Sequence, residues 1–292
     1  MNSAAAELRE ARRKSTMFAL MLTQSEKGTA FRALHQREQA FIMPNPWDPG
    51  TAILLQQLGF EALATTSAGF AFTLGKPDGG VARDVMLAHA AAVVAATDLP
   101  VSADLENCYA DDPAGAAETI RLAAAAGLAG CSIEDLPQGR DQAPYELSFA
   151  ADRVRAAAEA AHSLPFPFTL TARAENFIAG RPDLRDTIAR LEAYQEAGAD
   201  VLYAPGLRSK QDIASVVHAV DRPVNVIMGL QGVEMALSEL TELGVKRVSV
   251  GSALSRTALG AFLRAAREMK DHGTFSFSSR ALPSSEITSH FR

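Results

Sequence analysis

The fold is decided by the stretch Pro100-Val-Ser-Ala-Asp104-Leu-Glu106-Asn-Cys108-Tyr109 and by Gly130-Cys-Ser-Ile-Glu134-Asp135 further along the chain. Each is a short apolar run that ends in acidic residues, and a helical pattern separates the two. Buried strands joined in this way are parallel, so their carboxyl ends meet at one edge of a sheet. Carboxylates gathered there need a positive partner, and Mg²⁺ prefers oxygen ligands. The stretch therefore predicts a parallel sheet with a metal site at that edge.

The same strand–helix unit repeats along the chain from Ala40 onward. Candidate strands lie at 40–44, 62–66, 101–104, 130–134, 168–173, 201–203, 224–227 and 248–250, with alanine-rich helical patterns between them. About eight such units are what a closed (β/α)₈ barrel of the TIM type needs. A doubly wound open sheet is the alternative, but it usually has fewer repeats and a glycine-rich turn after its first strand. The first strand is followed here by Pro44-Asn-Pro-Trp47-Asp48-Pro49-Gly50, so we predict the barrel.

Composition narrows the class of protein. The formal net charge is −6 and acidic and basic residues are interleaved, so we expect no nucleic-acid partner. No apolar run is long enough to span a bilayer, so we expect no membrane partner. The two cysteines, Cys108 and Cys131, lie in different predicted elements without metal-ligand spacing. This usage indicates a reduced, cytoplasmic protein.

Three segments are expected from these patterns. They are an N-terminal helical extension over 1–30, a barrel domain over 31–272 and a C-terminal tail over 273–292. The acidic residues Glu7 and Glu10 argue against a signal peptide or a transit peptide at the start. A translation start at Met17 or Met21 remains the alternative to a genuine extension.

The active site of such a barrel forms at the carboxyl ends of its strands. Asp104 and Glu106 are two residues apart and point the same way along a strand, although a helix cap with a solvated loop is the alternative. Glu134 ends an otherwise apolar strand and needs a buried partner. Arg173 either clamps a carboxylate or phosphate or pairs with a neighbouring acid. Cys108 lies among acidic residues, which would not stabilise a thiolate, so we predict that it is not catalytic.

Five motifs in this order resemble those of the isocitrate lyase/phosphoenolpyruvate mutase superfamily, over residues 31–270. They are Thr66-Ser67-Ala68-Gly69, Leu74-Gly-Lys-Pro-Asp78, Ser102-Ala-Asp104-Leu-Glu106-Asn-Cys-Tyr109, Gly130-Cys-Ser-Ile-Glu134-Asp135 and Thr171-Ala-Arg173-Ala-Glu175. The resemblance implies a (β/α)₈ barrel whose last helix is swapped between subunits, in a homodimer or homotetramer. It also implies Mg²⁺ or Mn²⁺ and a small carboxylate substrate that passes through, or resembles, the enolate of a 2-oxo acid.

The resemblance also implies a role for each matching residue. Asp104 would bind the metal directly, and Glu106 and Glu134 would act largely through its waters. Ser67 and neighbouring backbone N–H groups would hold the substrate carboxylate or its enolate oxygen. The candidates are therefore Asp78, Glu134 and Arg173 as catalytic residues, Thr66, Ser67, Ala68, Gly69, Arg173 and Asn225 as substrate-binding residues, and Asp104, Glu106 and Glu134 as metal ligands.

Departures from the family pattern narrow the activity. The loop Leu136-Pro-Gln-Gly-Arg140-Asp-Gln142-Ala-Pro144 has neither the cysteine nor the histidine of the Lys-Lys-Cys-Gly-His loop found in isocitrate and methylisocitrate lyases. It also lacks the asparagine of the mutase branch. We therefore expect a Mg²⁺-dependent carbon–carbon lyase for a small 2-oxo or 2-hydroxy dicarboxylic acid, such as oxaloacetate or a malate derivative. A phosphonopyruvate-type P–C mutase or hydrolase and a non-catalytic 2-oxo acid binding protein are the alternatives.

Overall fold

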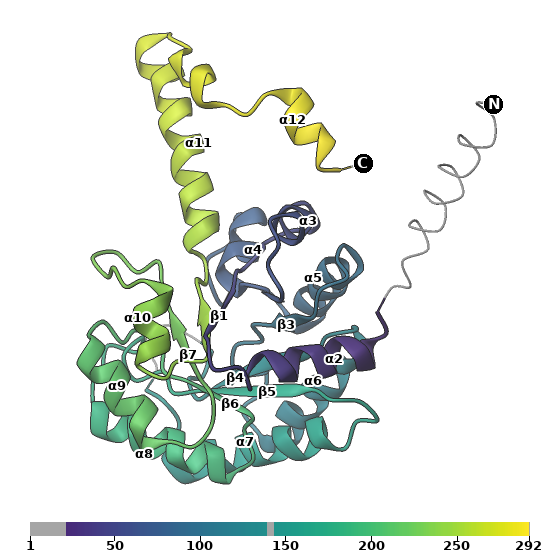
Figure 1. Ribbon diagram of the computed structural model, residues 1–292, viewed down its shortest axis with the longest axis vertical. Helices are drawn as coiled ribbons and strands as arrows, with labels where there is room; N and C mark the ends of the chain where they lie inside the picture. The colour runs from purple at the N-terminus through teal and green to yellow at the C-terminus, as the bar shows by residue number, and fades with distance from the viewer. Residues whose placement is uncertain (1–21, 139–142, 292) are drawn as a thin grey trace, which may run out of the picture.

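The structure is a computed structural model that describes residues 22–138 and 143–291. Eight parallel strands form one sheet in the order β1-β8-β7-β6-β5-β4-β3-β2. The outer strands β1 and β2 meet where Ala64 N donates to Pro44 O at 3.1 Å, so the sheet curls into a nearly closed barrel (Figure 1). The strands are β1 Phe41–Met43, β2 Leu63–Ala64, β3 Val101–Ala103, β4 Gly130–Glu134, β5 Thr169–Arg173, β6 Val201–Tyr203, β7 Val224–Ile227 and β8 Arg247–Ser249. The predicted (β/α)₈ barrel of the TIM type is thus confirmed.

Helices follow the strands and cover the outside of the barrel (Figure 1). Several begin at side-chain caps, as Asp112 shows by accepting a hydrogen bond from Gly115 N ahead of a proline at the first helical position. The short helix α4 directly after β2 was not predicted from the sequence. The covering helices are α3 Pro49–Gln57, α4 Ser67–Thr73, α5 Arg83–Ala95, α6 Pro113–Ala125, α7 Leu147–His162, α8 Leu184–Glu196, α9 Lys210–Ala219 and α10 Leu237–Glu242.

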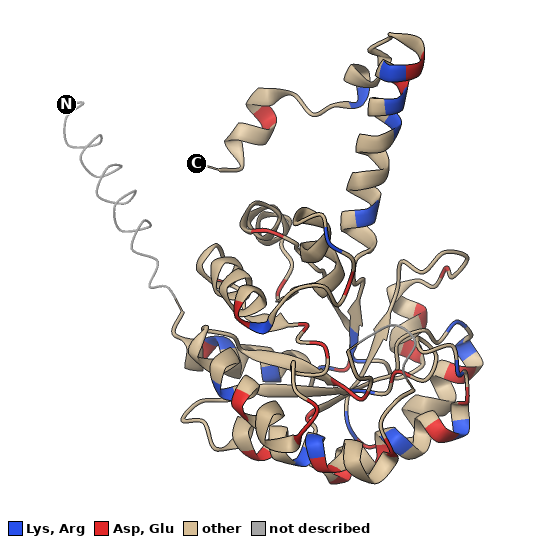
Figure 2. Cartoon of the chain, turned by 180° about the vertical axis from the view of Figure 1, so that it is seen from behind, with Lys and Arg blue, Asp and Glu red and all other residues tan. Residues whose placement is uncertain are grey.

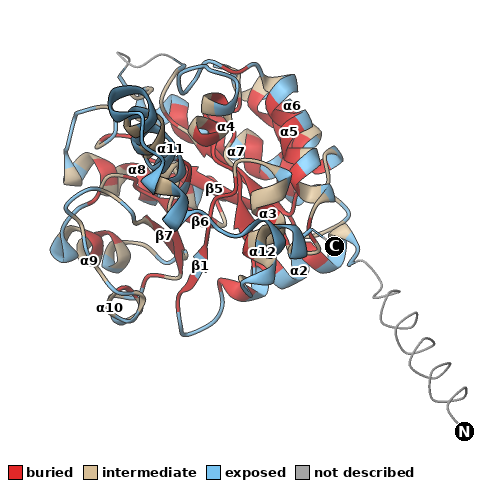
Figure 3. Cartoon of the chain, turned by 90° about the horizontal axis from the view of Figure 1, so that it is seen from above, coloured by how far each residue is buried: buried red, intermediate tan, exposed pale blue. Residues whose placement is uncertain are grey.

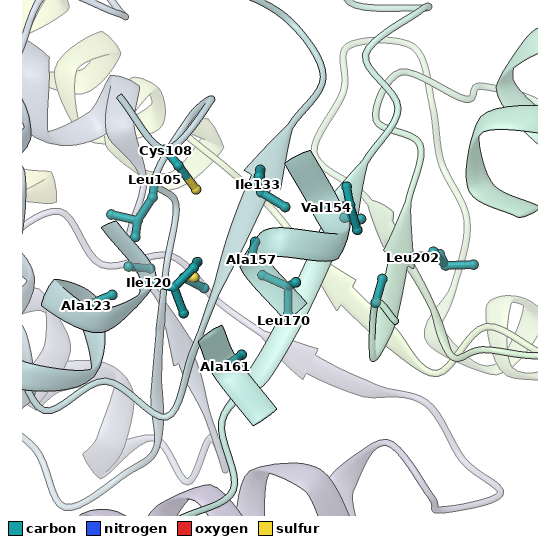
Figure 4. Packing of buried hydrophobic residues seen from close by; sticks show 14 of the residues in the cluster. Leu105, Cys108, Ile120, Ala123, Ile133, Val154, Ala157, Ala161, Leu170 and Leu202 are labelled. Atoms are coloured by element: carbon teal, nitrogen blue, oxygen red, sulfur yellow. The ribbon is translucent and has the colours of Figure 1, made fainter. Parts of the chain in front are cut away.

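The main hydrophobic core lies between the sheet and these helices. Ile133 and Leu170 on the strands pack with Ile120 of α6 and Val154 of α7 (Figure 4). Burial of one such side chain stabilises the fold by about 1.5–3 kcal/mol. Figure 3 shows the buried residues concentrated in the barrel and on the inner faces of its helices. Figure 2 shows acidic and basic residues interspersed over the outer helices.

Helix α2, Gln24–Leu34, closes the amino-terminal end of the barrel. Its Phe31 is fully buried against residues at the beginnings of the strands, including Phe41. Gly28 allows the close approach, because a Cβ atom there would lie 2.0 Å from Pro167 O. The helix continues past residue 30, where we expected the extension to end, and residues 1–21 lie outside the described part of the chain.

Helix α11, Ala253–His272, leaves the barrel instead of covering it (Figure 1). Ser255 is its only buried residue, and large apolar side chains such as Phe262 are exposed, in that case by 66%. The chain then returns through η1, Ser276–Arg280, and α12, Ser284–Ser289, to α3, where Gln57 Nε2 donates to His290 O at 2.6 Å. Within the described residues, no helix is both long and apolar enough to cross a membrane.

Candidate active site

A cavity of about 840 Å³ lies at the carboxyl ends of the strands. Most of the residues predicted as a site from the sequence line this cavity. Gly69 does not, because it is buried in α4, where an added Cβ would meet Thr66 and Trp47. The predicted residues that line it are Thr66, Ser67, Ala68, Asp78, Asp104, Glu106, Glu134, Arg173 and Asn225.

Arg173, at the end of β5, connects three carboxylates of the cavity. Its Nη1 lies 2.9 Å from Asp104 Oδ1 and 2.6 Å from Glu134 Oε1. Its Nε lies 2.7 Å from Glu175 Oε1. The guanidinium plane also faces the ring of Tyr203, with 5.0 Å between Cζ and the ring centroid. The pairing with neighbouring acids that we predicted as one option for Arg173 is therefore present.

Ser67 connects Asp104 to one further carboxylate, that of Asp78. It is the first residue of α4, whose cap Thr66 accepts a hydrogen bond from Gly69 N at 3.2 Å. Its backbone N and its Oγ lie 3.1 and 2.9 Å from Asp104 Oδ2. The same Oγ lies 3.0 Å from Asp78 Oδ1. Thr66 thus positions the helix, while Ser67 presents its donors to the carboxylates.

Glu106 lies in a tight loop after β3 whose backbone has an unusual conformation. Glu106, Cys108 and Tyr109 have φ angles of 50°, 59° and 55°, a region that non-glycine residues seldom adopt. The buried Arg153 of α7 supports this loop, because its Nη2 donates to Asn107 O at 2.6 Å and to Ala110 O at 2.8 Å. Its Nη1 donates to Glu134 O at 3.0 Å. One arginine behind the cavity therefore positions the backbone of two predicted metal ligands.

The carboxylates outnumber the positive charge near them, and their pKa values reflect this. Burial, together with Asp104 and Asp78, raises the pKa of Glu106 to about 7. Burial raises the pKa of Glu175 to about 7 as well, although Arg173 opposes the shift. Burial and the nearby acids hold the pKa of Glu134 well above its usual range. The cluster can therefore accommodate further positive charge.

The donor set fits a hard divalent cation. Asp104, Glu106 and Glu134 supply only oxygen atoms, which Mg²⁺ and Mn²⁺ prefer. Within residues 22–138 and 143–291, no three Asp, Glu, His or Cys side chains already converge as metal ligands, and Arg173 contacts both Asp104 and Glu134. Mg²⁺ commonly uses only one or two protein carboxylates and keeps several waters, so a convergent triad is not required.

The floor of the cavity contains a residue that the sequence analysis missed. Arg247 begins β8, and its Nε donates to Asn225 Oδ1 at 2.9 Å. Asn225 Nδ2 donates in turn to Ser249 Oγ at 3.0 Å. In the sequence, this charged residue directly precedes the strand predicted at 248–250, so the prediction left it outside the buried strand.

Cys108 is fully buried, and its Sγ lies 3.9 Å from Ser132 O. Figure 4 shows its side chain near Leu105 within the hydrophobic cluster. Burial raises the pKa of this thiol to about 12, so it remains protonated at neutral pH. This burial supports the prediction that Cys108 is not a catalytic nucleophile.

Comparisons with known proteins agree with this arrangement. The family model for phosphoenolpyruvate phosphomutase matches residues 31–270. The chain is 60% identical to a provisional lyase/mutase from Burkholderia cenocepacia J2315, with a TM-score of 0.89 and coverage of 92% of this chain and 96% of that one. It is 28% identical to oxaloacetate decarboxylase from Paraburkholderia xenovorans, covering 82% of this chain and 79% of that protein. It is 27% identical to 2-methylisocitrate lyase from Bacillus subtilis, covering 86% and 84%.

These matches extend over nearly the whole barrel and include the motifs whose residues line the cavity. An experimental structure of 2,3-dimethylmalate lyase, a member of the PEP mutase/isocitrate lyase superfamily, has the same fold, with a TM-score of 0.81 at 24% identity. The chain therefore belongs to the phosphoenolpyruvate phosphomutase family, within the PEP mutase/isocitrate lyase superfamily of enzymes.

Proposed function

We propose that the protein is a Mg²⁺-dependent carbon–carbon lyase that acts on a small 2-oxo or 2-hydroxy dicarboxylic acid. The observation that carries this proposal is the group of Asp104, Glu106 and Glu134 around Arg173 in a single cavity. Relatives named as an oxaloacetate decarboxylase and a 2-methylisocitrate lyase support the same reaction class. The concrete versions are decarboxylation of oxaloacetate and retro-aldol-type cleavage of a malate derivative.

The metal would be held by the acidic cluster. Asp104 would bind it directly, and Glu106 and Glu134 would act through its waters. When bound, Mg²⁺ would stabilise the negative charge that develops on the substrate as the carbon–carbon bond breaks, and Mn²⁺ could replace it. Arg173 would contact the substrate, since its guanidinium already lies between Asp104 and Glu134 and lines the cavity.

The protein groups around the substrate would orient it and move protons. Ser67 would present its backbone N–H and its hydroxyl to the 2-oxo acid. Both donors line the cavity side of α4 and in this structure contact a carboxylate oxygen of Asp104. In decarboxylation, the bond to the departing carboxylate breaks, its electron pair moves toward the 2-oxo oxygen, and a proton is then added to the adjacent carbon. Asp78, 3.0 Å from Ser67 Oγ, is close enough to the substrate position to take part in that proton transfer.

The sequence of the loop at 136–144 favours this version of the chemistry over others in the superfamily. It offers no thiol and no imidazole to act as the general acid in an isocitrate-type cleavage, and its residues 139–142 lie outside the described part of the chain. The end of β6, which reads Tyr203-Ala-Pro, offers no histidine of the kind found in the pocket of the mutase branch. A P–C bond reaction is the second candidate, because the family model that matches the chain is the one for phosphoenolpyruvate phosphomutase.

An NMR time course over a mixture of substrates tests the proposal. The mixture contains oxaloacetate, 2,3-dimethylmalate, methylisocitrate and phosphonopyruvate, each followed with Mg²⁺ and with EDTA. The Asp104→Ala protein is the blank, because oxaloacetate decays spontaneously in the presence of metal. Metal-dependent loss of one dicarboxylic acid above that blank supports the lyase. Preferential turnover of phosphonopyruvate would instead support P–C chemistry, and Mg²⁺-dependent oxalate binding without any turnover would indicate a binding protein.

We further propose that α11 packs against a second copy of the chain, in a dimer or tetramer with exchanged helices. The helix is long and projects from the barrel, which leaves β8 without a covering helix of its own chain (Figure 1). Its large exposed apolar residues are Leu254, Leu259, Phe262, Leu263 and Met269. A face of this kind is stable in water when another apolar surface covers it.

A further inference from the structure

Arg247 is a buried cation at the floor of the cavity, and its hydrogen-bond partners are all neutral. The residue is 3% exposed. Its Nε donates to Asn225 Oδ1 at 2.9 Å, its Nη2 donates to Thr171 Oγ1 at 3.0 Å, and its Nη1 lies 3.3 Å from His35 Nε2. These contacts come from β7, β5 and the C-cap residue of α2, so the side chain reaches across the interior of the barrel.

His35 does not supply a charge to this group. Its Nδ1 lies 2.9 Å from Phe31 O, and a carbonyl oxygen can only accept, so Nδ1 carries the proton. The other ring nitrogen, Nε2, is then free to accept from Arg247. Burial, reinforced by the positive charge of Arg247, lowers the pKa of His35 to about 3, so the ring is neutral.

No carboxylate compensates Arg247 within the described part of the chain, since none forms an ion pair with it there. Asp104 and Glu134 at the cavity mouth are instead paired with Arg173. Burial lowers the pKa of Arg247 to about 9, and the cation of Arg173 contributes in the same direction. A buried charge without a counter-ion destabilises the empty cavity, and an anionic ligand would relieve that cost.

The cavity therefore has two ends of different character. Its mouth carries the acidic cluster, while Arg247, at the beginning of β8, contacts only the neutral groups of Asn225, Thr171 and His35 among the described residues. The three contacts of Arg247 use three of its five N–H donors. Thr171, which Arg247 contacts, is two residues before Arg173 on β5, so the two levels are about 6–7 Å apart. A group at that depth lies within reach of the far end of a short dicarboxylate whose other end is held at the mouth.

We propose that Arg247 forms a second anion subsite, which binds the distal carboxylate of the substrate at the floor of the cavity. The 2-oxo or 2-hydroxy carboxylate would occupy the metal end at the mouth. Asn225 and Thr171 hold the guanidinium in place, so they act as positioning residues for this contact. The inference rests on the proposed function for the position of the first carboxylate, and it explains why a dicarboxylic acid would be preferred to a monocarboxylic one.

Isothermal titration calorimetry with two ligands tests the subsite without requiring turnover. Malate and 2-hydroxybutyrate of the same configuration differ in having a carboxylate or a methyl group at the distal end. The wild-type protein should bind malate about tenfold more tightly or better, with Mg²⁺ and also with EDTA, because Arg247 needs no metal. A wild-type ratio near one would overturn the proposal.

Variants identify the residue responsible. Arg247→Met should bring the ratio of the two dissociation constants close to one, by weakening malate alone. Lys246→Met is the matched control, because Lys246 is the neighbouring cation but points away from the cavity to Arg37 O and Glu38 O. It should keep the wild-type ratio. A folded Arg247→Met protein that still prefers malate would refute the subsite.

A second variant covers the case in which Arg247→Met does not fold. Arg247→Lys retains the charge but loses the planar fork, so its preference for malate should fall about threefold or more. An unchanged preference in this variant would also contradict the proposal. If no compound in the NMR mixture is turned over, the lyase assignment fails while the malate preference remains measurable, so the two failures can be told apart.

Discussion

Arg173 and Glu134 occupy paired positions at the ends of β5 and β4, and their side chains meet with 2.6 Å between Nη1 and Oε1. The same Nη1 lies 2.9 Å from Asp104 Oδ1 of the preceding strand's loop. One guanidinium thus fixes the carboxylates of neighbouring strand ends but does not neutralise the whole cluster. A site of this kind is preorganised for a cation and for a substrate that brings its own negative charge.

The fork of Arg173 should matter more than its charge. Arg173→Lys keeps the cation but cannot contact Glu134, Asp104 and Glu175 with one rigid plane. We expect kcat/KM to fall about 10²-fold, because the carboxylates lose their relative positions. Steady-state kinetics with the preferred substrate measures this.

Arg190→Lys is the matched control for that variant. Arg190 pairs with the buried Asp135 and with Asp186, and it does not line the cavity. Its substitution should lower Tm while leaving kcat/KM within about twofold. Equal losses of kcat/KM in the two variants would show that Arg173 acts only through the fold.

The metal-free protein should lose stability as the pH rises from about 4.5 to about 7. The folded-state pKa of Glu106 is about 7, above its ordinary value of 4.5, so the folded protein retains a proton that the unfolded chain has released. The free energy of unfolding then falls across this window, by an amount on the order of 3 kcal/mol for this group. Glu106→Gln should flatten the slope, as measured by urea unfolding in EDTA.

Added Mg²⁺ should offset that loss above pH 7, because it binds the ionised carboxylates. Parallel pH profiles of wild-type protein and Glu106→Gln in EDTA would speak against a buried, proton-retaining Glu106.

Arg153 should be required for the conformation of the loop after β3 that carries Glu106. Arg153→Met removes the guanidinium that donates hydrogen bonds to Asn107 O, Ala110 O and Glu134 O. These three carbonyl groups then lose a hydrogen-bond donor. We expect a loss of about 3–5 kcal/mol in unfolding free energy and about tenfold weaker Mg²⁺ binding. Chemical denaturation and calorimetric Mg²⁺ titration measure the two effects.

Arg155→Met is the control on the same helix. Arg155 lies two residues after Arg153 and is exposed, and among the described residues its one ion pair is with the exposed Asp152. Its removal should change the unfolding free energy by less than about 1 kcal/mol. Mg²⁺ affinity that is equally unaffected in Arg153→Met would mean that the loop holds its conformation without Arg153.

Helix α11 should determine the oligomeric state. Phe262→Asp places a charge on its exposed apolar face, so we expect dissociation toward a monomer by light scattering after size-exclusion chromatography. Arg264→Asp changes an exposed residue two positions on, which projects from a different side of the helix. It should leave the assembly intact. A wild-type protein that is already monomeric at micromolar concentration would contradict the exchange of this helix.

Much of the barrel was predictable because its signals are local. The apolar runs ending at Asp104, Glu134 and Arg173 indicated both the strands and the end of the sheet where their side chains meet. The side chains of these three residues do come together. Their spacing in the sequence carried this information because parallel strands align their carboxyl ends.

The supporting arginines were not predictable from the same patterns. Arg153 is part of a helical pattern with other charged residues. Only the packing of α7 behind the loop that carries Glu106 distinguishes it from the exposed Arg155. Arg247 adjoins a predicted strand, and its contacts with Thr171, Asn225 and His35 join elements far apart in the sequence. Such long-range partners depend on which side chains meet inside the closed barrel, and the strand and helix pattern does not specify these pairs.

The central claim is that Asp104 anchors a divalent cation to which the substrate carboxylate binds. Electron paramagnetic resonance of Mn²⁺ with oxalate enriched in ¹⁷O tests it directly, because coordination by labelled oxygen broadens the Mn²⁺ lines. The account predicts Mn²⁺ bound to the wild-type protein with lines broadened by labelled oxalate, and Mn²⁺ that stays free with Asp104→Ala. Mn²⁺ that remains free in the presence of the wild-type protein and oxalate would contradict it.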